Sequence, residues 1–409
     1  MSGGARGSLL LAWSLVAASP LQGQWVLRDG DDWTVELGGY VQALSAVQDV
    51  GFDIPDVERR SAFHGEVVRL KWTARGEGWV LEVHDRLQSQ LTSSDQAVGS
   101  SVVGFGVSAV PERSLDLETT LAEGDRYRVW HDVDRLALTL YTGAADVTLG
   151  RQAITWGISS LFPVADLWSR FSPFELDTEE KPGIDAVRVL AYPAAGLEVD
   201  GVMADRGSLD DLSAGVRASW SLAEADVYAA AGKFWRELIV LAGGTYLLEE
   251  VRLRVEAAFP FEPDGGGASR PRATAGFDLL RGSWVVAAEL HYNGIGEDTP
   301  GEYVDVLSDP RFGRGETYYL GRLLGGFLVS HTTTDRLTLS LSALGNLRDP
   351  SLALTPAVAY DVGQSARISL GGLLSFGEEP SFPSEGLPSL GSEFGTYGSL
   401  GYTQVSVYF

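Results

Sequence analysis

The chain ends in the alternating stretch Gly401-Tyr402-Thr403-Gln404-Val405-Ser406-Val407-Tyr408-Phe409, which closes on an aromatic residue. Successive side chains of a β-strand point to opposite faces. Val405, Val407 and Phe409 are therefore expected on one face, and the polar residues between them on the other. The stretch predicts a last strand with one apolar and one more polar face.

The other end of the chain has the features of a secretory signal peptide. Arg6 supplies a positive charge, the stretch Ser8 to Ala18 (SLLLAWSLVAA) is apolar, and small residues follow. This pattern predicts a cleaved signal over residues 1–24. Its apolar core is too short to span a bilayer as a helix, and no later stretch approaches that length. The chain has no cysteine, so we expect neither a lipid anchor on cysteine nor disulfides. We find no linker, and residues 25–409 are expected to form a single domain.

Strand periodicity dominates the chain after about residue 33. In Val251-Arg252-Leu253-Arg254-Val255, for example, apolar and charged residues alternate, which indicates a strand whose two faces meet different surroundings. We count about eighteen such strands, or about sixteen if a weak hairpin near residues 233–240 is misread.

The lengths of the connectors carry more information than the strands themselves. Numbered in order, the even connectors are all tight, such as those at 75–78 and 143–145, and every long connector is odd. The long ones cover residues 49–60, 91–126, 157–183, 293–315 and 377–395. Short turns that alternate with long loops are typical of transmembrane barrels, and hydrocarbon requires every backbone group of a spanning sheet to be paired. We therefore expect an all-β fold: a closed antiparallel transmembrane β-barrel with short periplasmic turns and long extracellular loops.

The net charge of −24 is distributed unevenly. The long loops are acidic, whereas the inferred lumen face is mixed, with Arg188, Arg252 and Arg254 against Glu198 and Asp200. Charged side chains on a pore wall set its ion preference. The alternative is that these residues only form salt bridges between neighbouring strands.

One segment resembles a known group of proteins. Gly150-Arg151-Gln152, Trp156-Gly157, Pro163, Asp166 and Gly183-Ile184-Asp185-Ala186-Val187-Arg188 follow the GRQ…WG…P.D…GxDAxR pattern. This resembles porin-like bacterial outer-membrane β-barrels, a broad group that includes alginate-export-type channels. The resemblance implies that residues 157–183, with Asp166 and Trp168, fold into the pore as a constriction, and that Arg151 and Arg188 lie on adjacent wall positions. It also implies that Val405, Val407 and Phe409 are the signal that the barrel-assembly machinery recognises.

The position of Arg151 conflicts with strict alternation. Alternation places Arg151 on the face of Val147 and Leu149, and an arginine in lipid costs roughly 2–4 kcal/mol at the midplane. Either a β-bulge at Gly150 turns the chain, or Arg151 lies near the membrane interface, and we expect the bulge. The alternative role for Arg151, Asp166 and Asp185 is to fasten the loop to the wall.

The remaining motifs argue against an enzyme. The five histidines are scattered, and none lies in a G-x-S-x-G or H-E-x-x-H setting. No catalytic residue, metal, cofactor or nucleic-acid partner is expected. The sequence predicts a passive channel for small polar or anionic solutes in the outer membrane of a Gram-negative cell. Its expected partners are lipid, lipopolysaccharide, the assembly machinery and small solutes, and a homo-oligomer is left open. The alternatives are a plugged accessory or structural barrel, and a transporter of hydrophobic compounds suggested by Phe162, Trp168, Phe171 and Phe174.

Overall fold

In the computed structural model, the structure describes residues 25–52, 58–93, 113–172, 174–176, 179–208, 210–261, 269–381 and 389–409. The predicted signal peptide lies outside the described residues. The strands are β1 (Trp25–Asp29), β2 (Trp33–Asp49), β3 (Arg60–Gly76), β4 (Trp79–Thr92), β5 (Glu118–Gly124), β6 (Tyr127–Tyr141), β7 (Ala145–Gln152), β8 (Ile184–Ala194), β9 (Leu197–Ala204), β10 (Ser213–Ser221), β11 (Ala225–Phe234), β12 (Glu237–Leu248), β13 (Val251–Phe261), β14 (Arg272–Arg281), β15 (Trp284–Asn293), β16 (Leu323–Thr334), β17 (Leu337–Asn346), β18 (Ser351–Val362), β19 (Ala366–Phe376) and β20 (Ser399–Tyr408). The helical segments are η1 (Pro300–Glu302), α2 (Tyr303–Ser308), α3 (Pro310–Gly313) and η2 (Phe394–Thr396). No helix in these ranges has the length and apolarity needed to cross a membrane.

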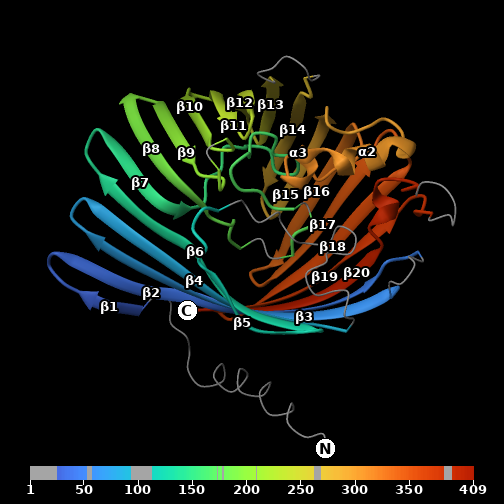
Figure 1. The fold of residues 1–409 in the computed structure, drawn as a ribbon, viewed down its shortest axis with the longest axis horizontal. Helices are drawn as coiled ribbons and strands as arrows, with labels where there is room; N and C mark the ends of the chain where they lie inside the picture. Colours follow the sequence, from blue (N-terminus) through green and yellow to red (C-terminus); the bar gives the residue numbers. More distant parts are fainter. Residues whose placement is uncertain are drawn as a thin grey trace, which may run out of the picture.

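Eighteen of these strands form a closed barrel. β2, β3, β4 and β6 to β20 each pair antiparallel with the next strand, and β20 pairs back with β2 from Tyr40↔Tyr408 to Asp49↔Ser399. The strands follow one another around the wall in chain order (Figure 1). The two additional strands lie beside this ring, because among the described residues β1 pairs with β2 alone and β5 with β6 alone. The predicted closed barrel is confirmed, and the doubtful hairpin near residue 233 is the regular pair β11 and β12.

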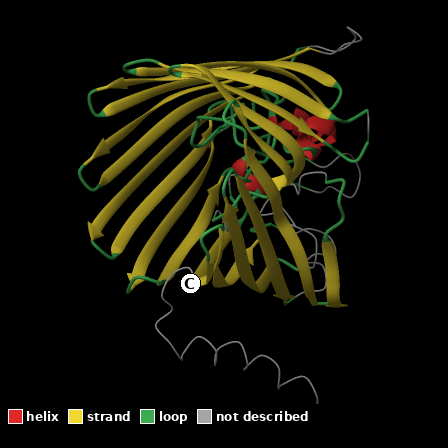
Figure 2. Ribbon diagram, turned by 90° about the vertical axis from the view of Figure 1, so that its left-hand side faces the viewer, coloured by secondary structure: helices red, strands yellow, loops and turns green. Residues whose placement is uncertain are grey.

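The two ends of the barrel differ as predicted. Tight turns join β3 to β4, β6 to β7, β8 to β9, β10 to β11, β12 to β13, β14 to β15, β16 to β17 and β18 to β19. The connectors at 153–183, 294–322 and 377–398, at the other end of the strands, are long. Figure 2 shows tight turns along one end of the strands, with the helices and longer loops toward the other end. The long connector between β4 and β6 contains β5, which extends the wall beside the loop end of β6.

Alternation sorts the side chains between the two faces of the wall. Val255 and Leu290 point outward and are exposed, whereas Glu256 and Glu289, their chain neighbours, are buried inside the barrel. Arg254 and His291 lie on the same inner side and are also buried. An apolar outer face around a polar interior is the pattern of a barrel that spans a bilayer.

The chain ends at the seam of the ring. The Phe409 N–H donates to the Gly39 carbonyl at 3.0 Å, and the Gly39 N–H donates to the Phe409 carbonyl at 2.7 Å. The Phe409 ring stacks on Trp25 of β1 with 5.4 Å between ring centroids. The last residue therefore completes the pairing of β20 with β2 and also contacts the strand that precedes the ring.

Candidate pore constriction

The connector between β7 and β8, residues 153–183, crosses the interior of the barrel. Its first part contacts inward side chains of β9, β13 and β15. Its last part contacts β3 and β4 through Glu180, and β20 through Glu179, whose carboxylate accepts a hydrogen bond from Tyr408. We call this connector the crossing loop.

Two wall carboxylates hold the first part of the crossing loop through its backbone. Glu289 accepts the N–H groups of Ser160 at 2.7 Å and of Leu161 and Phe162 at 3.0 Å each. Glu256 accepts the N–H of Ile158 at 2.8 Å. Hydrogen bonds to an ionised acceptor are stronger than neutral ones, and here they also satisfy amides that the loop cannot pair within itself. These carboxylates therefore fix the path of the loop.

The middle of the crossing loop is held by contacts within the loop and by one hydrogen bond to β9. Asp166 accepts the N–H of Trp156 at 3.0 Å and forms an ion pair with Lys181. The Trp156 indole donates to Asp200 on β9 at 2.9 Å, and Trp168 packs edge-on against Trp156 with 5.1 Å between centroids. The predicted site residues Asp166 and Trp168 are thus in the loop as expected, but both are almost fully buried. Their placement favours the fastening role over contact with a solute.

The far end of the crossing loop is held by charge. Glu180 pairs with Arg69 at 3.3 Å and with Lys71, and lies 3.6 Å from His84. Burial alone would raise the pKa of the Glu180 carboxyl, but hydrogen bonds from His84 and Lys71 and the charge of Arg69 together lower the pKa well below its usual range. The carboxylate therefore stays ionised and keeps this end of the loop on the wall.

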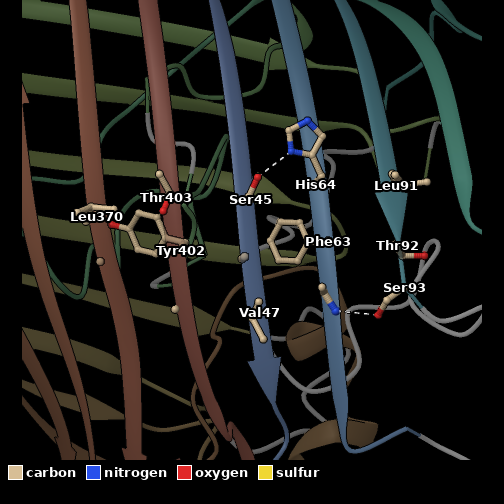
Figure 3. Close-up of a pocket in the computed structure, with 14 residues that line it drawn as sticks. Ser45, Val47, Phe63, His64, Leu91, Thr92, Ser93, Leu370, Tyr402 and Thr403 are labelled. Atoms are coloured by element: carbon tan, nitrogen blue, oxygen red, sulfur yellow. Dashed lines mark hydrogen bonds between the residues drawn. The ribbon is translucent and has the colours of Figure 1, made fainter. Parts of the chain in front are cut away.

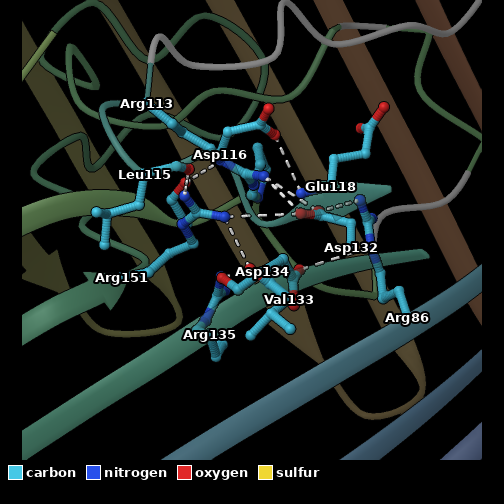
Figure 4. A network of polar contacts seen from close by, with 12 residues as sticks. Arg86, Arg113, Leu115, Asp116, Glu118, Asp132, Val133, Asp134, Arg135 and Arg151 are labelled. Carbon is cyan, nitrogen blue, oxygen red and sulfur yellow. Dashed lines mark hydrogen bonds and ion pairs between the residues drawn. The ribbon is translucent and has the colours of Figure 1, made fainter. Parts of the chain in front are cut away.

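A dense network of arginines and acids lies beneath this end of the loop (Figure 4). Its ion pairs are Arg69–Asp134 at 2.6 Å, Arg113–Asp132 at 3.0 Å, Arg86–Asp132 at 3.2 Å and Arg151–Asp185 at 2.8 Å. A β-bulge in β6 supports it: His84 pairs with Arg135 and Asp85 with Val133, which leaves Asp134 as the extra residue. The bulge lets both Asp134 and Arg135 reach the interior. Sequence reasoning missed Asp132 and Asp134, because alternation alone cannot reveal a bulge.

The predicted bulge at Gly150 is wrong. β7 pairs with β6 and β8 through Gly150 and Arg151 without a register shift, although Gly150 has a φ of +107°, which favours glycine. Arg151 needs no bulge because the chain covers it: its guanidinium donates to the carbonyls of Leu115 and Val133, and the residue is 1% exposed. Arg151 pairs with Asp185 while Arg188 pairs with Thr148, so the two arginines lie on neighbouring strands but three positions apart. They are not the adjacent pair that the resemblance implies.

The other predicted wall charges form ion pairs, line a cavity, or do both. Arg188 pairs with Asp200 at 2.8 Å, and Arg254 pairs with Asp278 at 2.6 Å and Glu289 at 3.0 Å. Arg252 and Glu198 instead line a cavity of about 900 Å³ on the tight-turn side of the crossing loop. Arg217, Asp226 and Arg254 line the same cavity, so its charged side chains include three arginines and two acids.

Two further connectors meet the crossing loop inside the barrel. Phe162 and Phe174 of the crossing loop pack in one apolar cluster with Tyr319 from residues 294–322 and with Phe394 and Tyr397 from residues 377–398. Phe162 and Phe174 thus form part of the core of this plug-like assembly, whereas Trp168 is buried in a separate cluster with Trp156 and Phe234. Three of the four aromatic residues that suggested a hydrophobic path are therefore buried.

A buried carboxylate joins two of these connectors. Glu393 accepts the N–H groups of Leu320 at 2.9 Å and Gly321 at 3.0 Å, and the side-chain amide of Asn346 at 2.9 Å. Burial raises the pKa of Glu393 to about 8. No sequence signal distinguishes Glu393 from the other acids of its loop.

Comparisons with known proteins agree with the architecture. No family model and no curated protein matches the sequence. Among solved structures, the chain is similar to OccAB3 of Acinetobacter baumannii, with a TM-score of 0.57, 10% identity, and coverage of 92% of this chain and 99% of that one. It is also similar to a BenF-like porin from Pseudomonas fluorescens Pf-5, with a TM-score of 0.56, 10% identity, and coverage of 92% and 98%. A third similar structure is OccK7 (OpdD) of Pseudomonas aeruginosa, with a TM-score of 0.52, 10% identity, and coverage of 93% and 99%. At this identity the likeness shows that the chain shares the fold of these barrels.

Proposed function

We propose that this protein is a passive channel in the outer membrane of a Gram-negative cell, through which small polar or anionic solutes pass. The crossing loop narrows the path, and the charged side chains of the wall and of the cavity beneath the loop set its ion preference. The chemistry is that of permeation and not of an enzyme.

The observation that carries this proposal is a polar interior crossed by one fastened loop, inside a closed wall with an apolar outer face. Eighteen strands enclose a bore wider than side chains alone fill. Beneath the loop there is a cavity of about 900 Å³ lined by Arg217, Arg252 and Arg254 against Glu198 and Asp226. Arg254 is paired with Asp278 and Glu289, so Arg217 and Arg252 are the cations that we expect to raise the local concentration of anions in this confined aqueous path.

Planar-bilayer recording tests the proposal. Purified protein should give ohmic conductance steps, and the reversal potential in a salt gradient should indicate anion preference. A protein that folds and inserts but gives no conductance would overturn the channel function.

One observation favours a second function, that of a plugged accessory barrel. Three connectors meet in the apolar cluster of Phe162, Phe174, Tyr319, Phe394 and Tyr397 within the barrel. If this assembly closes the bore, bilayers will stay silent while the inserted protein shows full heat-modifiable folding, and the same recording therefore separates the two functions.

The narrower resemblance to alginate-export-type channels belongs to the proposal as well. It is supported by the GRQ segment and by the position of the crossing loop directly after that segment. Recognition of Phe409 by the assembly machinery and contact with lipopolysaccharide are likewise parts of the proposed setting.

A further inference from the structure

The outer face of the barrel is uneven in its polarity. Through β9 to β20 and on to β2, the ionisable residues of the outward rows are Lys233, Arg281, His331 and Asp49, which all lie at or near strand ends. Between those ends, the outward rows of these described strands hold apolar, small or hydroxyl side chains. This is the surface expected against hydrocarbon.

The adjoining strands β3, β4 and β6 break this rule. His64 and Glu66 of β3, Asp85 of β4 and His131 of β6 occupy outward positions well inside their strands. Their direction follows from register: the inward residues Phe63 and Arg69 alternate with them on β3. We call these four residues the outer ionisable patch.

The patch lies within the height that the membrane covers. On β6, His131 lies between Tyr127, whose exposed ring is at the loop end, and Leu140, which pairs with Trp79 of β4 at the tight-turn end. On β3, Glu66 is six residues from Trp72, which is an exposed aromatic residue near the tight-turn end. Aromatic rings collect at both membrane interfaces, so residues between them face the hydrocarbon region unless protein covers them.

The patch is organised as two acid–imidazole pairs. His131 lies 2.7 Å from Asp85, and His64 lies 3.6 Å from Glu66 and 2.8 Å from the hydroxyl of Ser45. About a third of each of the four ionisable side chains is exposed, so the neighbouring side chains of the wall leave them partly uncovered. Ionisable groups in a membrane usually face protein or water, because hydrocarbon cannot replace their hydration.

The same wall is also hollowed beside the patch. A groove of about 750 Å³ runs over β19, β20, β2, β3 and β4, with Ser45, His64, Leu91, Leu370 and Thr403 among its lining residues (Figure 3). His64 belongs to both the groove and the patch, so the two form one continuous surface on the outer wall.

We propose that this surface is the contact between two copies of the chain, which meet about a two-fold axis along the membrane normal. The inference rests on the proposed insertion of the barrel in the outer membrane. A partner needs both acids and imidazoles to match the patch, and a second copy supplies that mixture. A ring of three or more copies would bring two different outward surfaces together. Because the outward rows from β9 to β20 offer no second polar surface, the isologous dimer fits better.

The available area suits such a contact. Five neighbouring strands at about 4.8 Å spacing and a band about 25 Å tall give roughly 600 Å² per copy before side-chain relief is counted. Side chains that project from the wall add to this area, and specific interfaces bury about 800 Å² per partner.

Cross-linking in native outer membranes tests the proposal, because the chain has no cysteine of its own. Val68→Cys places one thiol outward on β3 beside Glu66, four residues from Trp72. The matched control Ala288→Cys places a thiol outward on β15, four residues from Trp284. With flexible bifunctional maleimides we expect a homodimer band from Val68→Cys and at least tenfold less from Ala288→Cys.

A second variant ties the contact to the charged residues. This variant combines His64→Leu, Glu66→Leu, Asp85→Leu and His131→Leu with Val68→Cys, so that the outer face of β3, β4 and β6 is apolar. We expect its cross-linked fraction to fall at least fivefold. An unchanged fraction, equal yields from the two single-cysteine variants, or a product with a different protein would each overturn the dimer. Heat-modifiable migration and carbonate-resistant membrane association are measured on the same samples. If these fail for Ala288→Cys, the membrane barrel itself is at fault and not the interface.

Discussion

Arg254 and Glu289 form an ion pair of 3.0 Å across the inner wall, and both partners also hold the crossing loop. Arg254 donates to the Ser160 hydroxyl at 2.6 Å, while Glu289 accepts the N–H of Ser160 at 2.7 Å. One wall pair therefore forms hydrogen bonds with both the side chain and the backbone of Ser160. This pair therefore helps to fix the path of the loop.

Glu289→Ala should release the first part of the crossing loop. The change removes three charge-assisted hydrogen bonds, each contributing about 1.5–3 kcal/mol, and leaves Arg254 with fewer acid partners. We expect larger and noisier single-channel conductance, with the barrel still folded. Glu198→Ala, which removes a wall carboxylate that lines the cavity, serves as the control and should leave the noise unchanged. Identical conductance of the Glu289→Ala variant and wild type would contradict the fastening role.

Arg252 and Arg188 should respond differently to charge reversal. Arg252 lines the cavity, so Arg252→Glu should shift the reversal potential toward cations with little change in melting temperature. Arg188 pairs with the almost fully buried Asp200, so Arg188→Glu places two acids together and should cost roughly 3–5 kcal/mol of stability. Salt-gradient recordings beside melting curves measure both effects. If Arg252→Glu lowers the melting temperature and leaves the reversal potential unchanged, Arg252 is structural.

The outline of the fold was predictable because it depends on repeating patterns. Alternation in stretches such as Val251 to Val255 locates strands, and the parity of connector lengths orients them. The site was only partly predictable. The bulge that turns the buried Asp134 toward the interior and the burial of Arg151 under residues 113–117 both depend on long-range contacts that strand periodicity does not encode.

The residues that hold the loops illustrate the same limit. Glu256 and Glu289 could be placed on the inner face from alternation, but their backbone partners on the crossing loop could not, since those contacts join residues far apart in the chain. Whether Arg188, Arg252 and Arg254 meet a solute stays a prediction that the recordings above address.

Glu393 should make the packing of the interior loops depend on pH. Burial raises the pKa of this carboxyl to about 8, above the ordinary value of 4.5. The folded state therefore binds the proton more tightly than the unfolded state, and the associated stability is complete below pH 4.5 and is lost as pH rises to about 8. The loss is at most about 1.4 kcal/mol per pH unit for one proton. Melting curves between pH 5 and 9 should show this decline for wild type and a flatter profile for Glu393→Gln. Equal slopes for the two proteins would show that Glu393 does not titrate in this range.

Phe409→Ser should lower the amount of protein in the outer membrane by reducing assembly, and it should affect the stability of the assembled barrel far less. The backbone hydrogen bonds between Phe409 and Gly39 do not need the ring, and the ring contact with Trp25 joins a strand outside the eighteen-strand ring. The remaining pairs of β20 with β2 and β19 are also unaffected. We therefore expect a severalfold lower level in cells, but nearly normal heat-modifiable migration, melting temperature and spontaneous folding into lipid vesicles. Leu307→Ser, which removes an exposed apolar side chain of α2, is the control and should leave the cellular level unchanged. If Phe409→Ser folds as poorly in vesicles as in cells, the ring contributes to the structure itself, and the assembly role of the terminal aromatic residue is withdrawn.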